Sequence, residues 1–589
     1  MGNRSTTIIV VFLLVFVFFM AFFSMKDDSL IMDEVAHLPA GYSYLTQKDM
    51  RLNPEHPPLI KDLAAIPLLF IKNINFPSEI SEWKNDINGQ WGFGYNFLYQ
   101  KANPVDKMIF WARIPMILIL VLLGFYIFKW AKELFGEKVA LLALFLFSFS
   151  PTFLAHGRLV TTDVGAATGI FIATYYFLKA LKNPDKKNII FAGISFGLAE
   201  LAKFSVILLI PFFAILSLVW WLAGKSRSWQ KSLKIFILIL VIGYLLIGLV
   251  YQYHVLNYPF SRQVRDNEVF LSVYPDLIKK PILFMADKPI LRPYAQYLSG
   301  LFMVFNRASS GHTTYFLGEV SNQGWKNYFP IVYLIKEPLT FHILTIISFL
   351  SLAWFVNPAP LFSRKSGAGW QDTLPKIKNW ISNHFPEFAM LTFIVIYWTT
   401  SLISNLNIGV RHLLPVFPFT FILVSTTIIS LLKEPFLKFK YAFLGILILW
   451  QAISVILIYP HFLAYFNELV GGPDKGYIYT VDSNLDWGQD LKRLEKWVDK
   501  TGIEKIYLDY FGGGEAKYYL KEKYSPWHGN WDLKEFPKGN YLAVSATFLQ
   551  SGRGQAAPGF TQPTGYYLWL NKYKPITKIG YSIFIYYID

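Results

Sequence analysis

The chain has 589 residues, of which 54% are hydrophobic and 18% aromatic, and it carries a formal net charge of +16. A single soluble domain rarely combines this length with this apolar content, so the composition indicates a polytopic membrane protein. Nucleic-acid binding is disfavoured, because the Lys and Arg residues fall in short runs between apolar segments and not on one soluble surface. Without cysteine there is no disulfide framework, thiolate metal site or Cys nucleophile.

Apolar stretches of roughly the length of a bilayer span recur along the chain. They predict a polytopic all-α membrane domain with about 11 transmembrane helices. No small-residue cleavage site follows the first stretch, which we therefore interpret as an uncleaved anchor. The predicted spans are 8–24, 114–128, 139–153, 164–181, 189–202, 204–221, 235–251, 341–356, 388–403, 413–432 and 441–458.

Basic residues concentrate in every second loop between these spans. By the positive-inside rule these loops face the cytoplasm. An odd number of spans then places the N-terminus inside and the C-terminal tail outside, so we expect a multi-pass protein of the cytoplasmic membrane with its large loops and its active site on the extracytoplasmic side. The basic segments are 129–138, 179–187, 225–234, 357–385 and 433–440.

Two domains are predicted. Residues 1–460 form the transmembrane domain, with outer loops at 26–113 and 252–340, and residues 461–589 form an extracytoplasmic α/β domain. In the first loop, "VAHLPAGYSYL" and "PPLIKDLAAIPLLFI" are too short and too polar to span, and are expected to lie in the interface as helices. In the tail, "NLDWGQDLKRLEKWVDKTG" and "EAKYYLKEKY" predict helices, and "KIYLDYF", "YLAVSATFL" and "YSIFIYYI" predict strands.

Two motifs in the tail have competing interpretations. "YFGGGEAKYY" resembles a phosphate cradle, but no Lys-Ser/Thr follows the glycines, which favours a tight turn. "DSNLDWGQD" has the acid density of a calcium loop but lacks its Gly and terminal Glu spacing. Asp482 and Asn484 are therefore candidates for capping the next helix.

Ionisable residues gather at the outer ends of the predicted spans. Such groups are costly near hydrocarbon, so they are expected to pair with one another or with a ligand. Carboxylates can deprotonate a hydroxyl and cations can stabilise a departing phosphate, so the mixture suits a transferase of phosphate-linked groups. The residues are Asp33 and Glu34, Glu55 and His56, Arg158 and Asp163, Glu200 and Lys203, and Arg411 and His412.

Each pair also has a purely structural interpretation. Asp33 and Glu34 could be a solvated helix flank, and Glu200 with Lys203 a structural ion pair. Arg411 could be a snorkelling anchor and His412 a satisfied interfacial histidine. Arg158 and Asp163 could simply close a turn. These interpretations do not explain why every pair lies on the side without the basic loops.

Several motifs together resemble a known group of enzymes. "DE" after the first span, "HPPL" in the same loop, "TTD" before the fourth span, "GLAELAKFS" and "RHLLPVFPF" are similar to the GT-C membrane glycosyltransferases. Within them the chain is most similar to the glycosyltransferase family 39 type, which includes protein O-mannosyltransferases and aminoarabinose transferases. "GEVSNQGWKNYFPIVYLIKEPL" and "YFNELVGGPDKGYIYTVDSNLDWGQDLKRL" resemble a prokaryotic branch of that family.

The resemblance implies a sugar donor on polyprenyl or dolichyl phosphate, an acceptor hydroxyl on a lipid, glycan or protein, and inversion at the sugar carbon. It implies that Asp33 takes the catalytic acidic position, with Glu34 beside it and Asp163 as the second acid. Glu55 and His56 match a substrate-binding loop. From charge and location, the candidates for binding the lipid phosphate are Lys203, Arg411 and Arg158, and His412 is a further candidate for binding substrate.

The sequence departs from parts of this family. Protein O-mannosyltransferases carry a β-trefoil domain in a late loop, and 252–340 is too short to hold one, which counts against protein Ser/Thr acceptors. No D-x-D occurs, so a nucleotide-sugar donor is disfavoured. A divalent metal ion is a possible cofactor, but no ligand set with suitable spacing is visible.

Two other functions compete with the transferase. A transporter or flippase of lipid-linked glycans should carry its polar residues at mid-membrane, often in inverted repeats, and neither is apparent. A non-catalytic envelope assembly protein would not need the acids at the outer face.

Overall fold

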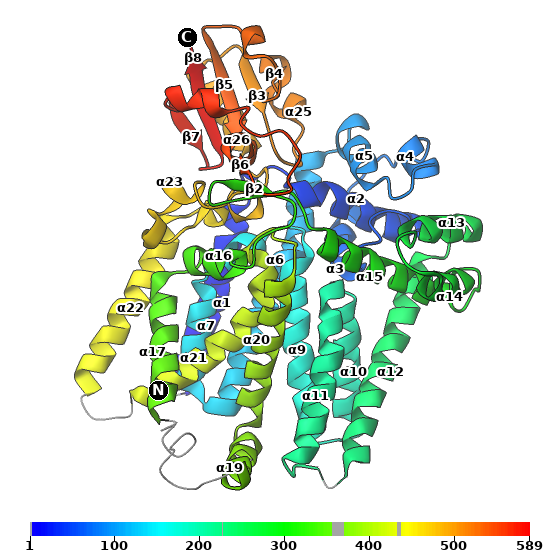
Figure 1. The fold of residues 1–589 in the computed structure, drawn as a ribbon, viewed down its shortest axis with the longest axis vertical. Helices are drawn as coiled ribbons and strands as arrows, with labels where there is room; N and C mark the ends of the chain where they lie inside the picture. Colours follow the sequence, from blue (N-terminus) through cyan, green and yellow to red (C-terminus); the bar gives the residue numbers. More distant parts are fainter. Residues whose placement is uncertain (1–2, 227, 356–369, 433–436) are drawn as a thin grey trace.

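The computed structural model describes residues 3–226, 228–355, 370–432 and 437–589. Long helices form a bundle, and a domain with strands lies above it, with shorter helices between the two (Figure 1). The N-terminus lies toward the lower end of the bundle and the C-terminus at the top of the strand-containing domain. Basic predicted segments 357–385 and 433–440 lie partly outside the described residues.

Eight helical segments among the described residues are long and apolar enough to cross a membrane. A ninth results if α16 (Tyr328–Lys336) and α17 (Leu339–Phe355), which meet at a 115° bend, form one span. The turns after α6, α9 and α11 lie at the lower end of the bundle (Figure 1). The eight segments are α1 (Asn3–Ser24), α6 (Val105–Phe135), α9 (Thr162–Lys182), α11 (Leu209–Leu222) with the preceding turn, α12 (Trp229–His254), α20 (Phe385–Ile403), α21 (Phe417–Leu431) with the preceding turn, and α22 (Leu437–Leu457).

The predicted helical membrane domain is confirmed, but two of the predicted spans are short. α7 (Glu137–Ser148) has 12 residues and α10 (Lys186–Glu200) has 15, although both run alongside longer helices of the bundle (Figure 1). At about 1.5 Å per residue, neither reaches the thickness of a hydrocarbon core. α7 ends just before Pro151, which begins the separate helix α8 (Pro151–His156). The count by length is therefore below the predicted 11.

Short helices form a layer across the top of the bundle (Figure 1). Both segments predicted to be interfacial lie in this layer, in α2 and α3. The helices of the whole layer bury only part of their surface. They position the first and second outer loops over the ends of the long helices. The layer contains α2 (Met32–Gln47), α3 (Leu59–Ala65), α4 (Ser81–Lys84), α5 (Gln90–Tyr95), α13 (Phe260–Phe270), α14 (Asp276–Ala286) and α15 (Arg292–Ser310).

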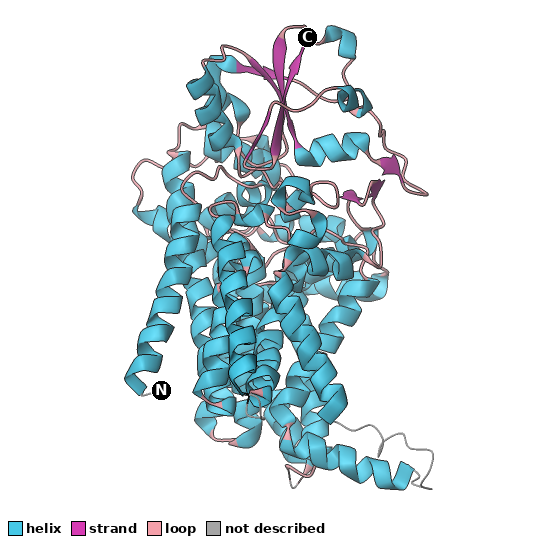
Figure 2. Ribbon diagram, turned by 90° about the vertical axis from the view of Figure 1, so that its left-hand side faces the viewer, coloured by secondary structure: helices cyan, strands magenta, loops and turns pink. Residues whose placement is uncertain are grey.

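The C-terminal region contains a five-stranded sheet of order β4-β3-β5-β8-β7, seen at the top of Figure 2. β3 pairs in parallel with β4 and β5, and β8 pairs antiparallel with β5 and β7. The predicted amphipathic helix is present, and "KIYLDYF" and "YSIFIYYI" contain the predicted strands. The strand predicted over "YLAVSATFL" is correct only as far as Ser545, because the rest of that segment lies in helix α26 (Ala546–Arg553). "EAKYYLKEKY" forms only the short helix α25 (Ala516–Leu520). The elements are β3 (Ile506–Asp509), β4 (Tyr524–Pro526), β5 (Asn540–Ser545), β7 (Thr577–Ile579), β8 (Ile583–Ile588), α24 (Leu491–Thr501) and α26 (Ala546–Arg553).

A smaller sheet joins the second outer loop to this region. β1 (Thr314–Phe316) pairs with β2 (Glu319–Ser321), and β2 pairs in parallel with β6 (Gln555–Ala556). The hydrogen bonds therefore cross the boundary predicted at residue 460. The C-terminal domain is bonded to the top of the membrane domain.

Candidate functional site

A cavity of about 340 Å³ lies at the upper end of the bundle, beneath the layer of short helices. Its walls come from α2, α15 and α20, from the loop before α3, and from the turns that precede α11 and α21. Six of the predicted site residues line it. They are Asp33, Glu55, His56, Lys203, Arg411 and His412.

Arg411 connects the two acids that the sequence places far apart. Its Nη1 atom lies 3.0 Å from Asp33 Oδ2 and 3.1 Å from Asp163 Oδ2. Lys203 Nζ donates to the other oxygen of Asp163 at 2.5 Å. Four outer segments thus meet in one row of alternating charges, which we call the cavity network: Asp33, Arg411, Asp163 and Lys203.

The two carboxylates of the cavity network differ in how many of their oxygens are bound to cations. Each lies in the first turn of a helix, where backbone N–H groups favour negative charge. Asp163 is buried and has both oxygens bound to cations. The side chain of Asp33 is 24% exposed, and within the described residues only Arg411 binds its carboxylate. Asp33 therefore keeps an oxygen available to a molecule in the cavity.

The C-terminal region completes the surroundings of Arg411. Buried Trp487 packs with its ring centroid 4.1 Å from the guanidinium carbon. The Trp487 carbonyl accepts from the Met32 N–H at 3.0 Å, and the Gln489 carbonyl accepts from the Ser29 N–H at 2.9 Å. This segment therefore binds the start of α2. A lone Trp in an acidic loop carries no sequence signal for such a role.

The capping role considered for Asp482 and Asn484 is wrong. α24 begins at Leu491, so both residues lie well before its first turn. Asn484 instead donates to the Tyr328 hydroxyl at 2.9 Å and accepts from the Val410 N–H at 2.9 Å. It fixes the backbone next to Arg411. Burial raises the pKa of Asp482 to about 6, while Arg411 opposes the shift.

On another wall of the cavity, Glu55 forms an acidic patch and His56 a neutral one. Gln90 Nε2 and Asn88 Nδ2 donate to Glu55 at 2.5 and 3.1 Å. Burial, and then the nearby His37, hold the pKa of His56 well below its usual value, so the ring is neutral near pH 7. Burial also lowers the pKa of His37, whose Nδ1 donates to the Val160 carbonyl at 2.9 Å. These rings can hydrogen-bond a ligand without adding charge.

Glu34 does not line the cavity. It is fully buried, and Arg113 binds both of its oxygens, at 2.9 and 2.6 Å. The N–H of Val160 donates to Glu34 as well, at 3.0 Å. Its predicted catalytic role stays a prediction, and the geometry gives it a part in holding α2 against α6.

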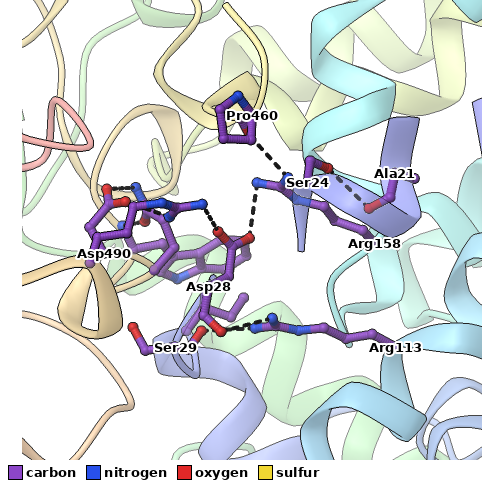
Figure 3. A network of polar contacts seen from close by, with 12 residues as sticks. Ala21, Ser24, Asp28, Ser29, Arg113, Arg158, Pro460 and Asp490 are labelled. Carbon is purple, nitrogen blue, oxygen red and sulfur yellow. Dashed lines mark hydrogen bonds and ion pairs between the residues drawn. The ribbon is translucent and has the colours of Figure 1, made fainter. Parts of the chain in front are cut away.

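Arg158 also lies away from the cavity. It pairs with Asp28 at 3.0 Å and donates to the Pro460 carbonyl at 3.2 Å, and Arg493 binds the same carboxylate at 2.8 Å (Figure 3). These contacts, with the Glu34–Arg113 pair, form what we call the anchoring network: Asp28, Glu34, Arg113, Arg158 and Arg493. It joins the first loop to the C-terminal region.

Glu200 and Arg307 lie outside the cavity network. Glu200 accepts from the Tyr297 hydroxyl at 2.8 Å, whereas Lys203 binds Asp163, so the ion pair considered between Glu200 and Lys203 is not formed in this structure. Arg307, in the last turn of α15, is exposed and lines the cavity. It has no ion pair among the described residues. Sequence reasoning missed it, because "NRASS" shows no pattern that separates it from other loop arginines.

Binding of a metal ion depends on how the donor side chains are arranged. Within the described ranges, no group of three or more His, Asp or Glu side chains is arranged to hold a metal ion. The acids of the cavity network are bound to Lys and Arg side chains. We therefore derive no chemical step through a metal.

Residues 105–251 match the model of the dolichyl-phosphate-mannose-protein mannosyltransferase family. The resemblance drawn from the motifs is confirmed for this segment. It runs from α6 to α12 and includes Arg158, Asp163 and Lys203, while Asp33 and Arg411 lie outside it. No curated protein sequence matches the chain.

Three solved structures that match the chain are each 17% identical or less, with TM-scores below 0.5. ArnT from Cupriavidus metallidurans, bound to undecaprenyl phosphate, is 13% identical with a TM-score of 0.43, over 100% of this chain and 98% of that chain. The oligosaccharyltransferase of Archaeoglobus fulgidus is 13% identical with a TM-score of 0.48, and the match covers 89% of this chain and 64% of that chain. The S. cerevisiae Pmt1–Pmt2 protein O-mannosyltransferase complex is 17% identical with a TM-score of 0.33, over 44% and 34%.

Proposed function

We propose that this protein is an integral membrane glycosyltransferase of the GT-C type. It transfers a sugar from a polyprenyl or dolichyl phosphate donor to an acceptor hydroxyl, with inversion at the sugar carbon. The observation that carries the proposal is the Asp33 carboxylate, which Arg411 fixes at the wall of a cavity that also contains Lys203 and Arg307. The family match over residues 105–251 supports the donor class.

In this proposal Asp33 is the general base. The acceptor oxygen forms a bond to the anomeric carbon as the bond from that carbon to the phosphate oxygen breaks. The acceptor proton passes to Asp33, and the polyprenyl phosphate leaves with the bonding electrons. A carboxylate suffices, because proton transfer can come late in a displacement with oxocarbenium character. A single displacement on the face opposite the phosphate inverts the centre.

The cations divide between two tasks. Arg411 is shared by two carboxylates, so its charge is used to hold Asp33 in place. Arg307 is exposed and has no ion pair within the described chain, so it is the cation best placed to meet the charge of the leaving phosphate. Lys203 also lines the cavity while bound to Asp163.

The site is proposed to face the extracytoplasmic side of the cytoplasmic membrane. The basic loops after α6, α9 and α11 lie at the opposite end of the bundle from the cavity, which supports this orientation. A reporter enzyme that is active only outside the cytoplasm, fused after Asp589, is expected to be active. Activity of a cytoplasmic reporter at the same position would contradict the orientation.

Asp33→Asn tests the catalytic assignment. It keeps the shape of the side chain but removes its basicity, so transfer from radiolabelled polyprenyl-phosphate sugars in membranes should fall roughly 10²–10⁴-fold. Asp27→Asn is the matched control, because Asp27 lies in the same loop in an exposed pair with Lys496 at 2.6 Å. It should retain activity. Wild-type transfer rates in Asp33→Asn would disprove the role of this base.

A further inference from the structure

A second cleft, of about 640 Å³, lies between the C-terminal domain and the first outer loop. One wall comes from the first turn of α2 and from α5, and the other from the loops around β3 and from the segment before residue 568. Aromatic rings are present in both walls. They are Trp91, Tyr95, Tyr510, Tyr524, Phe548 and Tyr566. Trp91 and Tyr95 are 43% and 39% exposed, so their faces are open to a ligand.

A carboxylate of the cleft is held with one oxygen free. Asp509 Oδ2 accepts from the Tyr567 hydroxyl at 2.6 Å and from the Gly529 N–H at 3.0 Å. His528 Nδ1 lies 3.8 Å from Oδ1, which is beyond hydrogen-bond distance. The amides of Asn530 and Gln562 also line the cleft, and neither makes a hydrogen bond within the described chain. Both can donate and accept.

The charge of the lining narrows the class of ligand. Asp509 and Glu515 are its carboxylates, and neither Lys nor Arg is among the residues that line it. Phosphate and other anions would meet repulsion there. A neutral sugar presents an apolar C–H face that packs on aromatic rings and a rim of hydroxyls that pairs with carboxylates and amides. The lining fits that combination.

The cleft and the cavity are neighbours. Trp91 lines both, while Met32 lines the cleft and the adjacent Asp33 lines the cavity. The Cα atoms of adjacent residues are about 3.8 Å apart, so the first turn of α2 forms part of the wall of both spaces.

The three-glycine turn fixes this arrangement. A Cβ atom at Gly513 would lie 2.3 Å from the Ile31 carbonyl oxygen, so only glycine allows the turn to approach α2 so closely. Tyr99 donates to the Gly513 carbonyl at 3.1 Å. The turn is therefore part of the wall and positions the C-terminal side of the cleft against the helix that carries Asp33.

We propose that this cleft binds a neutral saccharide, the acceptor of the transfer, and presents one of its hydroxyls to Asp33 past Trp91. The assignment of the saccharide as acceptor rests on the proposed function. The binding itself does not, because it needs no donor and no reaction.

The test measures binding of the purified full chain, without donor, to an array of neutral mannose-, glucose- and galactose-containing oligosaccharides. Ser/Thr-rich peptides and phosphorylated sugars are included on the same array. We expect neutral oligosaccharides to bind, and Tyr566→Ala to lower the affinity at least ten-fold. Tyr587→Ala is the matched control, because Tyr587 is an equally large exposed ring on β8, outside the cleft. It should bind as the wild type does.

A second variant guards against a folding defect. Tyr566 packs closely on Gly529 and Gly552, so its removal can disturb the domain. Gln562 is exposed and makes no hydrogen bond in the described chain, and Gln562→Ala should weaken binding about three-fold with an unchanged unfolding temperature. Unchanged affinity in both variants, no saccharide binding by the wild type, or binding of peptides or phosphorylated sugars alone would overturn the proposal.

The outcomes separate this proposal from the proposed function. Saccharide binding that Tyr566→Ala weakens, in a chain that transfers no sugar, would overturn the transferase and leave the cleft assignment intact. Sugar transfer that depends on Asp33, in a chain that binds no saccharide, would overturn the cleft alone.

Discussion

Asp33 and Glu34 are neighbours in the first turn of α2, yet they belong to two charged networks with different properties. Successive residues of a helix are rotated by about 100°, so the two side chains leave on different faces. Asp33 is 24% exposed and joins the cavity network through Arg411. Glu34 is fully buried and is bound by Arg113 and by the Val160 N–H.

The difference shows that two carboxylates within one helical turn can serve two purposes. Every acceptor position of Glu34 is directed at protein donors, so it stabilises a junction between segments. Asp33 has one such contact and faces a cavity, so it can meet a substrate. Replacing residues of the anchoring network should therefore cost stability, whereas changes in the cavity network should cost activity.

The largest effect on stability is expected from Arg113→Met. It leaves the Glu34 carboxylate buried without its cation, which typically destabilises a protein by about 3–5 kcal/mol. The loss should appear as a lower unfolding temperature of the detergent-solubilised chain. Lys132→Met is the matched control, because Lys132 pairs with Glu137 at 2.9 Å with both side chains partly exposed. That partly exposed pair should contribute little to stability. Equal stability of both variants would remove the distinction between the networks.

A smaller effect, on transfer and not on stability, is expected from Arg411→Lys. Lysine keeps the charge but cannot bridge two carboxylates in a fixed plane or stack on Trp487 in the same way. Transfer should fall roughly 10–100-fold, as expected when a positioned charge is displaced. Arg51→Lys is the matched control, because Arg51 also pairs with an acid, Asp49, and packs on a ring, Trp83, but lies outside the cavity. Similar losses in both variants would argue against a specific role for Arg411.

The smallest effect concerns Asp486, an acid that forms no ion pair among the described residues. Burial raises its pKa to about 8, although the Thr547 N–H donates to it at 2.8 Å. A raised pKa means that the folded state favours the protonated form, so the stabilisation is complete below the unfolded pKa of about 3.9 and is lost as the pH rises through about 8. Asp486→Asn keeps the neutral form at every pH. Its unfolding temperature should exceed that of the wild type by about 1–4 °C at pH 8 and by less at pH 5.

The control for this change is Asp474→Asn, since Asp474 is largely exposed and pairs loosely with Lys578 at 3.7 Å. It should show no pH-dependent gain. A gain of Asp486→Asn that grows toward low pH would show that the sign of the linkage is wrong.

Much of the fold and part of the site could be predicted from the sequence. Apolar length and basic loops indicate helices and their alternation, because both follow from the bilayer itself. Asp33, Lys203 and Arg411 could be placed near one another, because short turns return each helix end to the same surface. The difference between Asp33 and Glu34 could not, since it depends on which face of α2 meets α6.

Contacts between distant segments account for what was missed. Trp487 reaches Arg411 only because the loop before α24 folds back on α2, and no local pattern encodes that return. The shortness of α7 and α10 depends on breaks at Pro151 and after Glu200, which hydrophobic content alone does not reveal. β2 and β6 are more than 230 residues apart in the sequence, and strands of only three and two residues leave little signal in it.

The contact of Trp487 with Arg411 has a consequence for the order in which the protein is made. Asp33, Asp163 and Lys203 leave the ribosome first, then Arg411, and Trp487 follows only after α22. N-terminal segments fold before later ones during synthesis, so the guanidinium lacks one face of its surroundings until α22 is in place and the loop beyond it has docked. The pair of Arg411 and Asp33 thus reaches its final setting at the end of biogenesis, and a chain terminated before Trp487 would lack this contact.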